Sequence, residues 1–219
     1  CAFSMSFLNV FYTHMLLLPL LILSLKVSEF CGKRSKKKKK TKIGIKSIKF
    51  KILFVFILYP GIGQRIFQVM DCQEISGRFF LRADYAVSCF EGEHFIALFI
   101  AIACMFLYVI GIPLGLIIFL GRKRKQLRSP SMVEKFGGVY IAYTAGMWWF
   151  EAFEMIKKVI LVGGIVLISP GSTSQILLAF LIAFIFFSVI MGSKPYEEGL
   201  STKLQALTTG QLLLSIVLG

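Results

Sequence analysis

Four charged side chains stand close together at the start of an otherwise apolar segment. Glu151, Glu154, Lys157 and Lys158 precede an apolar run that is too short to cross a membrane alone. A crossing must therefore begin near Trp148, which draws the charges into the bilayer, where they must pair, extend to the interface or face a wet cavity. On a helix, Glu154 meets both lysines at i+3 and i+4, with Glu151 one turn earlier. The cluster is either part of an ion path or gate, or a structural ion pair that anchors two helices.

A second polar group lies on the last apolar segment, residues 201–219. Gln205, Thr208 and Thr209 fall on one face of a helix, with Gln211 at its margin. Such a stripe either lines a water-filled path or forms hydrogen bonds with a neighbouring helix. We favour the hydrogen bonds, because that is the more common role of polar residues in membrane helices.

No motif indicates enzymatic chemistry. The sequence has no HExxH, no GxSxG, no phosphate-binding loop and no His/Cys cluster with metal-ligand spacing. Residues 71–94 also lack the alternating oxygen ligands of a calcium loop. We therefore predict no enzymatic activity, no catalytic residue, no cofactor and no bound metal.

The composition is that of a membrane protein. Hydrophobic residues make up 57% of the 219 residues, and the mean hydropathy is +0.78. Twelve of the 25 basic residues fall within 26–51, between two apolar segments, so anionic lipid headgroups explain this charge better than nucleic acid. The residues predicted to bind headgroups are Lys36, Lys37, Lys38, Lys39 and Lys40. The expected partner is the lipid bilayer, and assembly into homo- or hetero-oligomers is left open.

The elements that position these groups are six predicted spans of an all-α, polytopic transmembrane bundle. In chain order they are span 2–25, polybasic cytoplasmic loop 26–51, span 52–70, extracellular loop 71–94, span 95–120, cytoplasmic or interfacial segment 121–147, span 148–168, span 173–191, cytoplasmic loop 192–200 and a truncated span 201–219. Acidic residues precede the span 95–120 and basic residues follow it, which predicts an N-terminus outside. We expect the chain to be a piece of a larger protein.

Two prolines interrupt predicted spans. Pro60, with Gly61 and Gly63 close behind, predicts a broken or sharply kinked helix that either lines a cavity or packs closely through its glycines. Pro113 has no N–H for the carbonyl of Val109, which predicts a helix break or kink there. In lipid the freed carbonyl needs a partner from a neighbouring helix or from water.

The predicted outer loop carries cysteines and charges. Cys72 and Cys89 stand seventeen positions apart on the side where disulfides persist, which predicts a bond between them. The loop also contains the acids Asp71, Glu74, Asp84, Glu91 and Glu93 and the arginines Arg78 and Arg82. The acids either concentrate cations at a pore mouth or pair with the arginines, and the sequence leaves both open.

An ordered set of motifs extends over about 140 residues. In chain order these are Tyr59-Pro60, Cys72, the run from Phe80 to Tyr85, Cys89, the run from Tyr108 to Pro113, Trp148-Trp149-Phe150-Glu151, Lys157-Lys158, Pro170-Gly171-Ser172 and Lys194-Pro195-Tyr196. The set resembles a family of large multi-pass proteins of protists, algae and oomycetes that are described as TRP-like or polycystin-like, often with extracellular cysteine-rich repeats. An outside N-terminus departs from the six-span TRP core, whose first helix starts inside.

The resemblance implies the membrane domain of a TRP-like cation channel or channel-like subunit. Glu151, Glu154, Lys157, Lys158 and the stripe Gln205, Thr208 and Thr209 would then lie near the ion path or gate. The alternative is a receptor-like or anchoring transmembrane module that carries a large extracellular region. Either protein is expected in the plasma or ciliary membrane rather than in an organelle.

Overall fold

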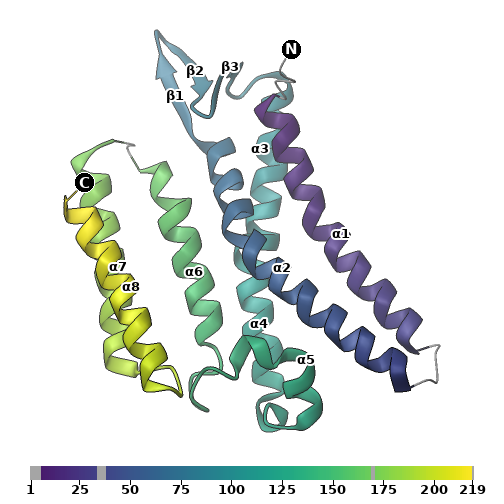
Figure 1. Cartoon of the computed structure of the whole chain (residues 1–219). Helices are drawn as coiled ribbons and strands as arrows, with labels where there is room; N and C mark the ends of the chain where they lie inside the picture. Colours follow the sequence, from purple (N-terminus) through teal and green to yellow (C-terminus); the bar gives the residue numbers. More distant parts are fainter. Residues whose placement is uncertain (1–5, 34–37, 169–170, 219) are drawn as a thin grey trace, which may run out of the picture.

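The computed structural model describes residues 6–33, 38–168 and 171–218, which are mostly helical (Figure 1). The α-helices are α1 (Phe7–Lys33), α2 (Lys38–Met70), α3 (Gly92–Cys104), α4 (Gly111–Arg122), α5 (Pro130–Tyr140), α6 (Phe150–Val162), α7 (Thr173–Ser193) and α8 (Gly199–Leu218). A π-helical stretch, η1 (Met105–Ile110), joins α3 to α4, and 3₁₀ turns form η2 (Arg124–Gln126) and η3 (Gly164–Leu167). The strands are β1 (Cys72–Ile75), β2 (Arg78–Leu81) and β3 (Asp84–Ser88).

Within the described residues, three helices are long and apolar enough to cross a membrane. They are Ile48–Met70 in α2, the continuous helix Gly92–Arg122 and α7. Helix α1 contributes a shorter apolar stretch, Phe7–Leu17. Figure 1 shows the strands and the N-terminal end of α1 at one end of the molecule, with the α4–α5 and α7–α8 connections at the other. This grouping agrees with the predicted sidedness, while the side that each end faces stays a prediction.

Two predicted features need correction. The polybasic segment 26–51 is largely helical, because α1 extends to Lys33 and α2 begins at Lys38. Lysine is a good helix former, so a run of lysines does not by itself end a helix. The fold is also not purely α-helical, because the segment 71–94 contains a three-stranded antiparallel sheet in the order β1-β2-β3. Between β1 and β2, Ser76 and Gly77 both have positive φ, which is the geometry of a two-residue hairpin turn.

Helix α2 is not broken at Pro60. It continues through the proline to Met70, and Figure 1 shows that it changes direction part-way along its length. A Cβ on Gly63 would lie 3.1 Å from the Cγ2 atom of Val159 in α6, whereas one on Gly61 would meet nothing within 4 Å. Close packing through a glycine, one of the two predicted alternatives, is therefore present at Gly63.

The helix around Pro113 also continues without a break, and the carbonyl that this proline frees has a partner. The hydroxyl of Tyr59 in α2 donates a hydrogen bond of 2.8 Å to the carbonyl oxygen of Val109. Tyr59 is 2% exposed, so water cannot easily replace it there. The π-helical turn η1 ends directly before Gly111, two residues ahead of the proline. The predicted need for a neighbouring helix is confirmed, and α2 supplies it.

The substitution Tyr59→Phe is expected to lower the free energy of unfolding by about 1 to 2 kcal/mol, because it removes the donor of the partly buried Val109 carbonyl. Tyr85→Phe is the matched control, since the Tyr85 hydroxyl bonds Gln73 on the exposed face of the sheet. That change is expected to stay within about 0.5 kcal/mol. Unfolding of both variants in bicelles tests the difference, and equal effects would contradict the role assigned to Tyr59.

Candidate functional site

The charged cluster of α6 contains a buried ion pair. The Nζ atom of Lys157 lies 2.7 Å and 2.6 Å from the two carboxylate oxygens of Glu154. The two residues are 8% and 3% exposed, so little solvent screens the pair. Because each charge would be costly to bury alone, the pair is what allows both residues to lie inside the structure.

Residues from two other helices complete the pair. The side-chain amide of Gln205 in α8 donates a hydrogen bond of 3.2 Å to the Glu154 carboxylate. The Lys157 ammonium lies 5.9 Å from the centroid of the Phe186 ring in α7. Glu154 therefore also contacts α8 and Lys157 also contacts α7, so the pair joins the three helices at one polar point.

Glu151 has a different partner from Glu154. Its carboxylate accepts a hydrogen bond of 2.6 Å from the hydroxyl of Tyr143, in the connection between α5 and α6. Tyr143 forms an antiparallel β-bridge with Tyr196, in the connection between α7 and α8. The pKa of the Tyr196 hydroxyl is raised to about 12, mainly because the side chain is partly buried. Glu151 thus ties α6 to the α5–α6 connection and lies outside the ion pair.

The remaining predicted residues do not gather around the pair. Lys158 is exposed and forms no ion pair within the described residues, although the sequence placed it within reach of Glu154. The hydroxyls of Thr208 and Thr209 both donate to the carbonyl oxygen of Gln205, in their own helix. Thr209 is buried and Thr208 is exposed, so Gln205 alone connects the predicted stripe to the charges of α6.

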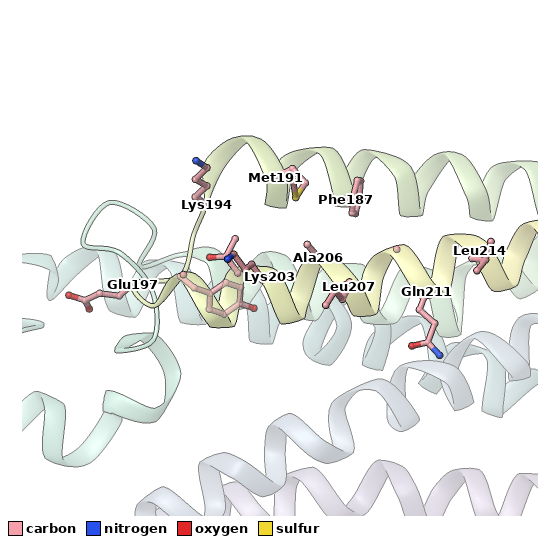
Figure 2. A pocket seen from close by; sticks show the side chains of 13 residues that line it. Phe187, Met191, Lys194, Glu197, Lys203, Ala206, Leu207, Gln211 and Leu214 are labelled. Carbon is pink, nitrogen blue, oxygen red and sulfur yellow. The ribbon is translucent and has the colours of Figure 1, made fainter.

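An apolar groove of about 1050 Å³ lies along α7 and α8 (Figure 2). Its walls include Phe187 and Met191 of α7 and Leu207 and Leu214 of α8. In Figure 2, Lys194, Glu197 and Lys203 are labelled at one end of the groove, near the α7–α8 connection. Gln211, at the margin of the predicted stripe, also lines this groove and is exposed.

The disulfide predicted between Cys72 and Cys89 is confirmed. It joins the start of β1 to the residue that follows β3, with Cα atoms 6.3 Å apart. The Arg82 guanidinium lies 3.2 Å from the Asp71 carboxylate, so pairing with arginine, one of the two alternatives left open for the outer acids, occurs at Asp71. Burial raises the pKa of the Asp71 carboxyl above its ordinary value, and Arg82 opposes this shift.

His94 is a structural residue that the sequence did not single out. Its ring is 1% exposed, and its Nδ1 atom accepts a hydrogen bond of 3.1 Å from the backbone N–H of Phe90. Its Nε2 atom lies 3.0 Å from the carbonyl oxygen of Val69. The nitrogen and sulfur ligand atoms of Cys72, Cys89 and His94 lie within 4.8 Å of one another, but the disulfide occupies both thiols that a metal would need. His94 therefore ties the start of α3 to the end of α2.

The predicted headgroup-binding lysines are not placed by the structure. Lys36 and Lys37 lie outside the described residues, and so do the side chains of Lys38, Lys39 and Lys40. Their role stays a prediction.

Comparison with known proteins gives one distant similarity. The chain is 26% identical over 160 residues to "Cysteine repeat modular protein A" of Toxoplasma gondii. The alignment covers 67% of this chain and 5% of that protein, so the chain spans a small part of the relative's length. No family model and no solved structure matches the chain.

Proposed function

We propose that this chain is a multi-pass membrane module that anchors the extracellular region of a larger protein, as a receptor-like or purely anchoring unit. The observation that carries the proposal is the closed ion pair of Glu154 and Lys157. Each charge neutralises the other, and Gln205 takes a further carboxylate contact. A carboxylate that is already paired and 3% exposed is poorly suited to attract a passing cation, and well suited to hold helices together.

Two further observations support an anchor. The disulfide-bonded sheet lies at the same end of the molecule as the start of α1 (Figure 1). The relative is named for cysteine repeats and is far longer than this chain. By analogy, the module would hold a cysteine-rich extracellular region on the sheet's side of a plasma or ciliary membrane.

A channel subunit is the second candidate, and one observation favours it. Thr208 and Gln211 are exposed on α8, and Gln211 lines the groove between α7 and α8. Polar side chains on an exposed membrane helix are well placed to face a path that several copies enclose.

Whole-cell current from the full-length protein, with surface biotinylation on the same cells, separates the two candidates. For an anchor, we expect surface protein without current above that of untransfected cells. Residues 1–219, expressed alone, should then be recovered in the membrane fraction. A cation current that changes in a Glu151→Gln/Glu154→Gln variant or in Gln211→Leu would overturn the anchor and support a channel. The current of Lys158→Gln, an exposed change on α6, serves as the control.

A further inference from the structure

A pocket of about 520 Å³ lies just past the end of the candidate span Gly92–Arg122, at the α4–α5 connection. Three cationic side chains line it, those of Arg124, Lys125 and Arg128, together with aromatic rings that include Trp148. Cations and aromatic rings directly after an apolar helix are typical of the boundary between lipid and water. The pocket is separate from the ion pair of α6, because neither Glu154 nor Lys157 lines it.

Within the described residues, none of the three cations forms an ion pair. All three are exposed, and the ion pairs found in the described part of the chain are Arg82–Asp71 and Lys157–Glu154. Among the residues that line the pocket, Glu197 is the one acid. The lining therefore carries an excess of two positive charges, which favours an anionic occupant.

The pocket walls are fixed by hydrogen bonds and packing. The hydroxyl of Tyr140 donates a bond of 2.7 Å to the carbonyl oxygen of Leu127, which holds α5 against the cationic segment. The backbone N–H of Glu197 donates a bond of 2.9 Å to the carbonyl oxygen of Ala142, which places the α7–α8 connection on the opposite wall. A Cβ on Gly121 would lie 3.2 Å from the Trp148 ring, so the indole packs closely on α4. The cations thus stand in a preformed site.

We propose that this pocket binds a phosphate monoester, supplied by the headgroup of an anionic membrane phospholipid. Arginine guanidinium groups match phosphate oxygens with two parallel hydrogen bonds, and two arginines and a lysine suit a doubly charged group. Basic pockets between membrane helices are a recurring form of headgroup site. A lipid is the favoured source because the pocket adjoins the end of a candidate span, where headgroups lie at high local concentration.

The test uses the full chain in phosphatidylcholine nanodiscs, with phosphatidic acid as the lipid probe and glycerol phosphate as the soluble probe. A Trp149→Phe background leaves Trp148 as the reporting indole, because the chain has two tryptophans. Half-saturation of the Trp148 fluorescence change is measured for each probe. The double variant Arg124→Gln/Arg128→Gln is expected to weaken phosphatidic acid binding roughly tenfold to thirtyfold, because each charge contributes about threefold to fivefold.

Two matched variants exclude simpler explanations. Arg122→Gln/Lys123→Gln removes the same charge from the neighbouring residues, neither of which lines the pocket, and is expected to weaken binding by less than about threefold. Glu197→Gln removes the acid of the lining and should strengthen binding, a gain that misfolding cannot produce. Equal weakening by the two double variants, or no fluorescence change in the parent protein, would overturn the proposal. Saturation by glycerol phosphate that phosphatidic acid does not displace would reject the lipid as the source.

Discussion

Replacing Lys157 with methionine is expected to lower the free energy of unfolding by about 3 to 5 kcal/mol. The substitution keeps an unbranched chain of similar length but removes the ammonium that lies within 2.7 Å of both Glu154 oxygens. Glu154, at 3% exposure, would remain as a buried charge with the Gln205 amide as its partner. An uncompensated buried charge costs more than the pair itself contributes, which is why removing one partner has a large effect.

The neighbouring lysine provides the control for this prediction. Lys158→Met makes the same chemical change on the same helix at an exposed position, and is expected to change stability by no more than about 0.5 kcal/mol. The double variant Glu154→Leu/Lys157→Met should recover most of the loss, because no buried charge remains. Unfolding in bicelles, followed by circular dichroism, measures all three. Equal destabilisation by the two lysine variants would show that the pair does not hold α6 in place.

Removing the disulfide is expected to cost about 3 kcal/mol, from the entropy of closing a loop of 17 residues. Cys72→Ser, Cys89→Ser and the double variant should be destabilised equally, because each loses the same bond. The loss should appear as faster hydrogen exchange of the amides of β1, β2 and β3, with little change in α7 and α8.

Cys104→Ser is the control for the disulfide variants, since Cys104 is a free cysteine at the end of α3. Peptide mapping without reduction should recover Cys72 and Cys89 in one linked fragment. Alkylation of both residues without prior reduction, or a double variant that is clearly less stable than either single variant, would contradict the bond or its assigned effect.

Local chemistry made several features predictable from the sequence. A proline in a helix frees the same carbonyl in any fold, so the need of Val109 for a partner followed from Pro113 alone. Glu154 and Lys157 are three residues apart on one helix, so their contact required only that the segment be helical. Cys72 and Cys89 were the cysteines of one predicted outer loop, which left few alternatives for pairing.

Partners from distant segments were not predictable. No sequence signal near Val109 indicates that Tyr59, 50 residues earlier, supplies the hydrogen-bond donor. Likewise, no signal near Glu154 indicates that its amide partner is Gln205, 51 residues later. Such contacts depend on how the helices pack, which periodicity does not specify. The hydrogen bond between Tyr143 and Glu151 is not predictable from the sequence, because the two residues fall in different predicted segments, 121–147 and 148–168.

The strands were missed for a different reason. They are four or five residues long, too short for a clear alternating pattern, and their exposed positions include both apolar and charged residues. The Ser76-Gly77 pair was the available signal, because such dipeptides often mark a hairpin turn. His94 carried no signal, since its role depends on the end of α2 and the start of α3 meeting.

The ion pair of α6 also affects the order in which the helices are expected to enter the membrane during synthesis. Helix α7 is apolar enough to cross a membrane alone. Helix α6 is not among the three candidate spans of the described residues and carries four charges, and one charge at the centre of a span costs about 3 kcal/mol. Lys157 and Glu154 offset each other as soon as α6 forms, but the amide of Gln205 is synthesised 51 residues later. We therefore expect that α6 inserts into the bilayer only after α7 and α8 have been synthesised. In a translation product that ends before α8, α6 should remain uninserted.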